Sequence, residues 1–195
     1  MFWPKKNLPA LQGIPLSLNG FRVRLRPPVL SDYQDWTRVR AKNKAYLTPY
    51  EPLWHPQALS RDFFRRRVER QQKDWMQDRA YSFLIVNQKD GGLIGGVNIN
   101  SVCRGAGQYG SLGYWIDEDL QGQGLMAESL RLIIDFSFDQ IKLQRLNAAC
   151  LPHNSRSINL LLKLGFAEEG FAEKYIQING TREDHRLFGL NRPDA

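Results

Sequence analysis

The segment from Gly113 to Glu128, GYWIDEDLQGQGLMAE, constrains the fold of this 195-residue chain more than any other part. An apolar, aromatic run that resembles a strand ends in an acidic turn, and Gly122 and Gly124 follow. Apolar residues then recur at helical spacing, at Met126, Leu130, Ile133, Ile134, Phe138 and Ile141. Because glycines allow close backbone approach and the first N–H groups of a helix lack internal partners, this arrangement predicts a phosphate or pyrophosphate site. A glycine turn without a ligand explains this segment alone nearly as well.

Length and composition indicate a single globular domain. The chain is 42% hydrophobic, and no run approaches the roughly 18 apolar residues that a membrane span needs. Prolines interrupt the N-terminal region, so we expect an irregular arm over residues 1–20 and one domain over residues 21–195. Cys103 and Cys150 are the only cysteines, and without a secretory signal we expect reduced thiols and a cytoplasmic location.

The net charge of +7 favours an anionic ligand or partner. Much of the charge lies in one stretch that contains Arg61, Arg65, Arg66, Arg67, Arg70 and Lys73. Acidic residues interrupt this set, which is typical of a solvated helix face, and we favour that interpretation over a nucleic-acid site.

The order of expected elements is strand, two helices, three strands, helix, strand, helix and two strands. Strands are expected at 21–26, 80–86, 93–102, 108–116, 145–150, 171–178 and 183–190. Helices are expected after a Ser31 cap, over 60–77, from the glycine turn to about 142, and over 155–164, with an ordered loop at 46–56. This order predicts an α/β chain with a mixed sheet and helices on its faces.

A second glycine motif, from Gly105 to Gly110, matches the G-x-G-x-x-G string of dinucleotide-binding proteins. That fingerprint requires a strand before it and a helix after it, whereas here a second strand follows. We therefore expect a loop and no nicotinamide or flavin site.

Two segments together resemble the GCN5-related N-acetyltransferase (GNAT) superfamily. They are the glycine turn and the stretch that begins at Asn154 and ends at Gly165. Finer matches, to the ribosomal-protein-alanine N-acetyltransferase (RimJ/RimL-like) group, lie at Leu25–Pro27, Leu47–Pro52, Gly113–Ile116, Asn154 with Ser157, and Gly180 with Asp184–His185. The resemblance runs from about residue 22 to 190. It implies a GNAT acyl-CoA N-acyltransferase fold, with a mixed, mostly antiparallel sheet and helices on both faces, and acetyl-CoA as co-substrate.

The resemblance also assigns the acetyl-CoA site. The superfamily pyrophosphate motif falls on Gln121, Gly124 and Met126, where methionine departs from the usual glycine or alanine. The Ile116 N–H is expected to polarise the thioester carbonyl. The expected acetyl-CoA-binding residues are Trp115, Ile116, Gln121, Gly122, Gln123, Gly124, Leu125, Met126 and Asn154. The three histidines lack ligand spacing, so we expect no metal site.

The expected catalytic residues are Ser157, Asn154 and Asp184. Many members of the superfamily protonate the thiolate with a tyrosine seven residues after the asparagine, but that position is Leu161 here. Ser157 is the nearest replacement, although a hydroxyl that bonds its own helix explains it equally well. Asn154 is expected to contact the pantetheine or position the amine, and it is also predicted to cap the helix.

Asp184 is the first choice for the base, ahead of Glu173 and Glu183, and an ion pair with Arg182 or His185 is the alternative. An α-amine titrates near 8, so roughly a tenth of it is neutral at pH 7 and weak help suffices.

The expected acceptor is the N-terminal alanine of a ribosomal protein. A small-molecule amine, such as an aminoglycoside or a polyamine, is the second hypothesis. A non-catalytic acyl-CoA-binding or ribosome-assembly module is the third, and the leucine in place of the usual tyrosine supports it. The sequence fits a monomer or a homodimer, and predicts neither membrane nor direct nucleic-acid binding.

Overall fold

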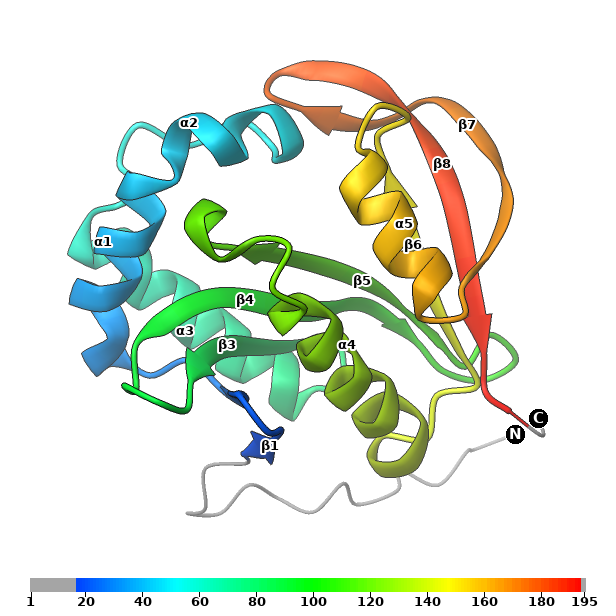
Figure 1. Cartoon of the computed structure of the whole chain (residues 1–195), viewed down its shortest axis with the longest axis horizontal. Coiled ribbons are helices and arrows are strands. Elements are labelled where there is room, and N and C mark those ends of the chain that lie inside the picture. Colours follow the sequence, from blue (N-terminus) through cyan, green and yellow to red (C-terminus); the bar gives the residue numbers. More distant parts are fainter. Residues whose placement is uncertain (1–16, 194–195) are drawn as a thin grey trace.

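The computed structural model describes residues 17–193, which form a sheet of eight strands in the order β1-β2-β3-β4-β5-β6-β8-β7 (Figure 1). The strands are β1 (Leu18–Asn19), β2 (Val23–Arg26), β3 (Tyr81–Asn87), β4 (Leu93–Cys103), β5 (Tyr109–Ile116), β6 (Arg145–Cys150), β7 (Ala167–Ile178) and β8 (Thr181–Asn191). Within this range neighbouring strands are antiparallel, apart from the parallel pair β5 and β6.

Helices cover both faces of the sheet (Figure 1). They are α1 (Tyr33–Lys42), α2 (Lys44–Leu47), α3 (Arg61–Met76), α4 (Leu125–Asp135) and α5 (Ser155–Lys163). Short turns of 3-10 helix occur at Leu30–Asp32, Thr48–Tyr50 and Glu118–Leu120, and a π-helical turn, Phe136–Gln140, continues α4. No helix of the described range is long and apolar enough to cross a membrane.

Two clusters of buried side chains hold the layers together. The larger joins α4, α5 and one face of the sheet, with Phe83, Leu130 and Phe188 among its most buried members. The smaller packs α1 and α3 on the opposite face through Trp36 and Phe64, whose ring centroids lie 5.0 Å apart. The sheet is therefore buried between two helical layers over β2 to β5.

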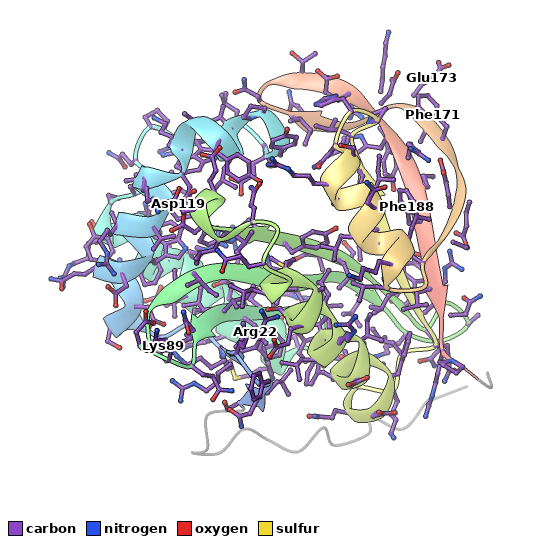
Figure 2. The ribbon with its side chains drawn as sticks, in the orientation of Figure 1. Arg22, Lys89, Asp119, Phe171, Glu173 and Phe188 are labelled. Carbon is purple, nitrogen blue, oxygen red and sulfur yellow. The ribbon has the colours of Figure 1, made fainter. Side chains whose placement is uncertain are left out.

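Side chains of β7 and β8 differ sharply in exposure. Figure 2 shows Phe171 and Glu173 projecting outward from β7, whereas Phe188 on β8 points toward α5. Phe171 is 55% exposed and Phe188 is 1% exposed. The β7 strand thus forms an exposed edge of the sheet, and β8 carries the core contacts.

Most of the expected elements are confirmed, and so is the predicted mixed sheet. Ser60 caps α3 by accepting the Phe63 N–H at 3.2 Å, and Gly165 follows α5 with a φ of +89°. The G-x-G-x-x-G string at residues 105–110 spans the turn from β4 into β5, with no helix after it, as expected.

Four expectations are wrong in detail. Ser31 does not cap α1; its N-cap is Asp32, whose carboxylate instead binds Arg26 at 2.5 Å. The expected loop at 46–56 begins in helix, in α2 and the turn at Thr48–Tyr50. The α-helix after the glycine turn ends at Asp135, and a π-helical turn replaces its last expected turn. In the expected arm, residues 1–16 lie outside the described range, but Leu18–Asn19 forms β1 against β2.

Candidate active site

The parallel strands β5 and β6 pair over only three positions, and they separate beyond that point (Figure 1). The ladder joins Tyr109–Ser111 to Arg145–Asn147. A cavity of about 550 Å³ opens where it ends, and both Tyr114 and Trp115 line it. Since successive side chains of a strand point to opposite faces, a cavity lined by both residues passes through the sheet. It therefore connects the face covered by α4 and α5 with the face covered by α1 and α3.

The N–H of Ile116 points toward this opening. The next N–H, that of Asp117, donates to Ile94 on β4 at 2.8 Å. At the other end of β5, the carbonyl of Gln108 accepts the Gln144 N–H at 2.7 Å on the β6 side. Backbone groups alternate between the two edges of a strand, so both contacts place the Ile116 N–H on the edge that faces β6. The expected oxyanion donor is thus directed into the space between the separated strands.

The glycine turn leads into the N-terminus of α4 in the conformation that its sequence requires. Gly122 and Gly124 have φ angles of +71° and +77°, which disfavour other residues. The first helical bond runs from the Glu128 N–H to the Gly124 carbonyl at 3.0 Å, so the N–H groups of residues 125–127 precede the hydrogen-bonded turns. The side chain of Met126 is buried in the core, which explains why a methionine is compatible with a backbone donor at this position.

One of the backbone N–H groups that were expected to bind phosphate already has a hydrogen-bond partner within the chain. The Gln121 N–H donates to the Glu118 carbonyl at 3.2 Å and closes the short 3-10 turn, so the available backbone donors begin at Gly122. The side chain of Gln121 remains at the site. Its Oε1 accepts a hydrogen bond from Arg156 of α5, while its Nε2 is buried and finds no acceptor within residues 17–193. A buried, unpaired donor beside free backbone N–H groups fits an anionic ligand.

The C-terminal end of α1 holds the turn that precedes the glycines. Lys42 contacts both carboxylate oxygens of Asp117 at 2.9 Å and reaches Asp119 at 2.7 Å. Buried Asn43 accepts the Glu118 N–H at 2.8 Å. Although burial alone would raise it, hydrogen bonds from Lys42, Asn43 and the backbone hold the pKa of the Asp117 carboxyl below its ordinary value.

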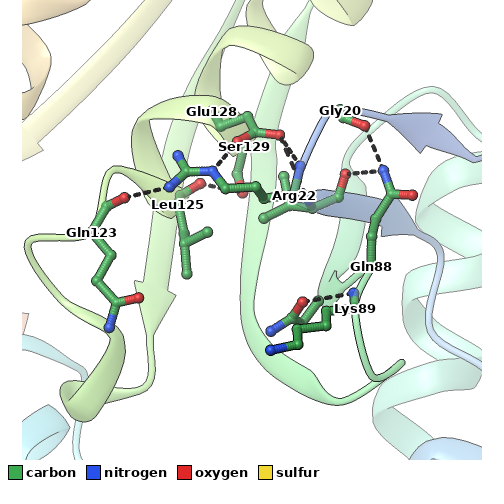
Figure 3. A network of polar contacts seen from close by, with 10 residues as sticks. Gly20, Arg22, Gln88, Lys89, Gln123, Leu125, Glu128 and Ser129 are labelled. Atoms are coloured by element: carbon green, nitrogen blue, oxygen red, sulfur yellow. Dashed lines mark hydrogen bonds and ion pairs between the residues drawn. The ribbon is translucent and has the colours of Figure 1, made fainter.

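A second contact fixes the first turn of α4 to β2 (Figure 3). Arg22 donates from its backbone N–H to Glu128 at 2.7 Å and from its guanidinium at 3.0 Å. The same guanidinium donates to the carbonyl of Gln123 at 2.8 Å, which ties the glycine turn to the adjacent sheet edge. Burial would raise the pKa of the Glu128 carboxyl, but the hydrogen bonds from Arg22 outweigh it and hold this pKa below its ordinary value. A positive side chain therefore lies beside the turn.

Ser157 lies in a chain of polar groups at the cavity wall. Its hydroxyl is 2.5 Å from the hydroxyl of Tyr114 and 3.2 Å from the sulfur of Cys150, which donates to it. Burial raises the pKa of the Tyr114 phenol and, less strongly, that of the Cys150 thiol, so both groups remain protonated at neutral pH. The N–H of Ser157 donates to Asn154 Oδ1 at 3.2 Å, which confirms the predicted helix cap. Asn154 and Ser157 both line the cavity.

Sequence reasoning missed the contact of Tyr114 with Ser157. The tyrosine expected on α5 is replaced by Leu161, which is fully buried, but a phenol reaches the same hydroxyl from β5. The alternation of side chains along β5 could have pointed to Tyr114, because it places this residue on the same face of the strand as Ile116.

Asp184 is not among the residues that line the cavity, so its expected role as the base stays a prediction. Its carboxylate accepts the Lys174 N–H of β7 at 2.8 Å. The neighbouring His185 lines the cavity, so Asp184 points to the opposite face of β8. Glu173 and Glu183 are also absent from the cavity lining. Strand alternation could have shown that only one of two adjacent residues faces the site, but not which one.

The far wall of the cavity combines aromatic rings with charged groups. Glu51 binds Arg40 through both oxygens, at 2.7 and 2.5 Å, and accepts the Trp54 N–H at 2.8 Å. The Arg40 guanidinium lies 4.3 Å from the ring centroid of Trp54 and 4.9 Å from that of Trp115. The hairpin of β7 and β8 closes over this wall, where its Asn179 N–H donates to the Glu51 carbonyl at 2.9 Å.

The interpretation of the basic stretch on α3 as a solvated face needs correction at Arg67, which is only partly exposed and lines the cavity. Arg70 also lines the cavity but is exposed, as are Arg65 and Arg66. Helical spacing contained this signal, because Arg67 lies one turn after Phe64, whose side chain is buried.

Within residues 17–193, no group of three or more histidine, cysteine, aspartate or glutamate side chains is placed to hold a metal ion. The arginines and carboxylates in the cavity wall are Arg40, Glu51, Arg67 and Arg70.

Comparisons with known proteins agree with this geometry. The family profile described as the acetyltransferase (GNAT) domain matches residues 22–167. A ribosomal protein uS5-alanine N-acetyltransferase of Escherichia coli (strain K12) is 32% identical over 196 residues, which cover 100% of this chain and 97% of that protein. The probable N-acetyltransferase YjcK of Bacillus subtilis (strain 168) is 32% identical over 177 residues, 91% of this chain and 98% of its own.

Two solved structures superpose closely on the chain. The ribosomal-protein-S5-alanine acetyltransferase of Vibrio fischeri has a TM-score of 0.86 at 29% identity, over 92% of this chain and 98% of that one. Mycobacterium smegmatis RimJ in complex with CoA-disulfide has a TM-score of 0.86 at 26% identity, over 91% of this chain and 88% of that one. The shared architecture thus extends over nearly the whole length of each chain.

Proposed function

This chain belongs to the acetyltransferase (GNAT) family and is an acetyl-CoA-dependent N-acetyltransferase, and from that premise we propose that its acceptor is the N-terminal alanine of a ribosomal protein. The observation that carries the proposal is full-length similarity, at 32% identity, to a protein named for this acceptor. The cavity supports it as well, because side chains of α5, such as Ser157, and of α3, such as Arg67, line the same space between the two helical layers and leave room for an acceptor.

The glycine turn is the part that we assign to the diphosphate. The N–H groups of residues 122–126 precede the hydrogen-bonded turns of α4 and lie at its positive end. Open space surrounds the α-carbon of Gly122, where an added β-carbon meets no atom within 4 Å. Arg22 and Arg156, held at Gln123 and Gln121, place two positive charges beside the turn.

Bound acetyl-CoA supplies the activated acyl group, and the residues of the chain orient and polarise it. We assign the acyl oxygen to the Ile116 N–H, which points into the opening between β5 and β6. Trp115 and Ile116 present the free edge of β5 along this opening, where an extended arm can pair with the strand. Asn154 positions the start of α5, since its side chain caps that helix.

The hydroxyl pair of Ser157 and Tyr114 is the proton donor that we assign to the leaving thiolate. A serine hydroxyl alone is a poor acid, but here a protonated phenol lies 2.5 Å from it and can replace the transferred proton. A thiol has a pKa of about 8.5, so the thiolate is a stable leaving group that needs only weak assistance from a proton donor. The paired hydroxyls thus serve in place of the tyrosine that Leu161 replaces.

We assign the role of general base to His185, in place of Asp184. Its Nδ1 lies 2.9 Å from the Glu183 carbonyl, which can only accept a hydrogen bond, so Nδ1 carries the proton. The other ring nitrogen, Nε2, then keeps a basic lone pair on a side chain that lines the cavity. We propose that Nε2 accepts the proton of the incoming amine, directly or through a water molecule.

Mass spectrometry of protein N-termini tests the acceptor. Cells with and without the gene are compared, and the purified protein is then incubated with acetyl-CoA and the candidate ribosomal protein. The expected result is one or a few alanine N-termini that lose acetylation in the deletion strain and regain it in vitro. Unchanged N-termini, together with turnover of a small amine such as a polyamine, would instead support the second hypothesis.

We also keep two sequence expectations as proposals. The family match over residues 22–167 supports a single domain over residues 21–195. An acceptor in the ribosome supports a cytoplasmic location, which fractionation of cells that express a tagged chain can test.

A further inference from the structure

The cavity has more positive than negative charge on the side that is lined by α1 and α3. Arg40, Arg67 and Arg70 line it there, and Glu51 is the only carboxylate that the described residues contribute to its wall. Both oxygens of Glu51 already bind Arg40. Within residues 17–193, Arg67 and Arg70 therefore have no carboxylate partner.

Arg67 is the unusual member of this set. It follows buried Phe64 by one turn of α3, and its guanidinium lies 5.6 Å from the ring centroid of Trp36. Burial lowers the pKa of Arg67 to about 10; the positive charges of Arg40 and Arg70 add to this shift, and the negative charge of Glu51 opposes it. An unpaired cation removed from water destabilises a fold, so a cation that faces a cavity is suited to bind an anion from outside.

The location of Arg67 indicates that this anion belongs to the acceptor and not to acetyl-CoA. The glycine turn lies at the opposite layer, beside α4, while Arg67 belongs to the layer of α1 and α3. Arg67 lines the same cavity as Trp115, the neighbour of Ile116, so an acceptor whose amine reaches Ile116 through this cavity brings its following residues near Arg67. A peptide advances about 3.3–3.6 Å per extended residue, so a side chain within the first few residues can reach this guanidinium.

We propose, on the basis of the function proposed above, that Arg67 together with Arg70 binds a carboxylate of the acceptor, so that the enzyme selects N-termini with an aspartate or glutamate among their first few residues. The planar guanidinium can bind both oxygens of a carboxylate, and the aromatic surroundings strengthen the contact by excluding water.

A peptide series tests this proposal. Each peptide begins with alanine and carries a single glutamate at position two, three, four or five, and a matched peptide carries glutamine there. At saturating acetyl-CoA, we expect glutamate at one position to raise kcat/KM about ten- to one hundred-fold over glutamine, as a charge-assisted hydrogen bond implies. Equal values for every pair would overturn the proposal.

Enzyme variants show whether Arg67 is responsible. In Arg67→Met the preference for glutamate should vanish, while Arg66→Met, on the exposed side of the same helix, should retain it. A preference that persists in Arg67→Met contradicts the assignment. Because this change removes a partly buried cation without a carboxylate partner, we expect it to leave the melting temperature unchanged or raise it. Arg67→Lys keeps the charge but loses the planar fork, so it should retain only part of the preference and serves as the second variant if Arg67→Met unfolds.

The series also separates this inference from the function on which it rests. If acidic and neutral peptides are acetylated equally well, only the carboxylate site is wrong. If no peptide is acetylated although acetyl-CoA raises the melting temperature, the acceptor class itself is wrong, and the carboxylate site fails with it.

Discussion

At the scale of single residues, the hydroxyl of Ser157 is contacted by side chains from two other elements. The phenol of Tyr114 contacts it from β5 at 2.5 Å, and the thiol of Cys150 contacts it from β6 at 3.2 Å. Three separate segments thus converge on one oxygen atom at the cavity wall. Loss of any one contact should change the proton affinity of this oxygen without changing the glycine turn.

We expect Ser157→Ala and Tyr114→Phe each to lower kcat about tenfold to one hundredfold, at the lower end of general acid catalysis. The KM for acetyl-CoA should change little, because neither hydroxyl belongs to the phosphate-binding turn. Since the two groups act as one donor, the double variant should be no worse than either single one. Steady-state kinetics of the three variants checks this. Additive losses would show two independent roles, and full activity of Ser157→Ala would exclude it as the acid.

The adjacent residues Asp184 and His185 provide a matched pair. We expect His185→Gln to lower kcat roughly one hundredfold, since glutamine lacks the basic ring nitrogen. Asp184→Asn should leave kcat unchanged, because this carboxylate binds the Lys174 N–H on the other face of β8. It should cost only about 1 kcal/mol of stability, as one hydrogen bond is weakened. Rates with an alanine N-terminal peptide and chemical denaturation measure the two effects. The reverse pattern would restore Asp184 as the base.

At the scale of elements, the glycine turn shows where sequence and conformation agree most closely. Gly124 is the N-cap of α4 with a left-handed φ of +77°, and an added β-carbon would lie 3.3 Å from the Arg22 guanidinium. A side chain at this position must therefore strain the backbone, displace Arg22 and occupy the space in front of the free N–H groups.

Gly124→Trp should abolish the rise in melting temperature that acetyl-CoA causes, and should cost about 1–2 kcal/mol of stability from the left-handed backbone. Gly170→Trp is the control, since Gly170 lies on the exposed edge strand β7, has no positive φ and has no neighbour within 4 Å of its added β-carbon. Differential scanning fluorimetry with and without acetyl-CoA compares them. A retained shift in Gly124→Trp would place the diphosphate elsewhere.

The contact between β2 and α4 predicts a dependence of stability on pH. Because the pKa of Glu128 is lowered in the folded state, its contacts with Arg22 stabilise the fold above the ordinary glutamate pKa of about 4.3. This contribution is lost as the pH falls through the lowered value. Glu128→Gln should therefore melt below wild type at neutral pH, and the difference should shrink in acid. Thermal melts from neutral pH to pH 3 test this; a constant difference would show that protonation of Glu128 plays no part.

At the scale of the whole molecule, features that depend on residues close together in the chain could be predicted from the sequence, and contacts between residues far apart in the chain could not. The glycine turn, the cap at Asn154 and the hairpins follow from local spacing and were predicted. The contact of Tyr114 with Ser157 joins residues 43 positions apart, and the position of Arg67 depends on how α3 packs on the sheet. Strand alternation limits such choices to two faces, but the fold alone decides between them, as Asp184 and His185 show.

The two glycine motifs, at residues 105–110 and 122–124, differ in the elements that follow them, and this difference provides a test of the acetyl-CoA site. A ligand that binds only the folded state stabilises it by about 2.7 kcal/mol at one hundred times its Kd. For a chain of this length, acetyl-CoA at that concentration should therefore raise the melting temperature by about 5–10 °C. NADH should cause no shift, because the string at residues 105–110 leads from β4 into β5 and presents no helix N-terminus. Parallel melts with acetyl-CoA, coenzyme A and NADH measure this. A shift with NADH alone would mean that the wrong glycine segment was chosen, whereas a shift with both coenzyme A and acetyl-CoA would show that the diphosphate moiety, common to both, provides the main contact.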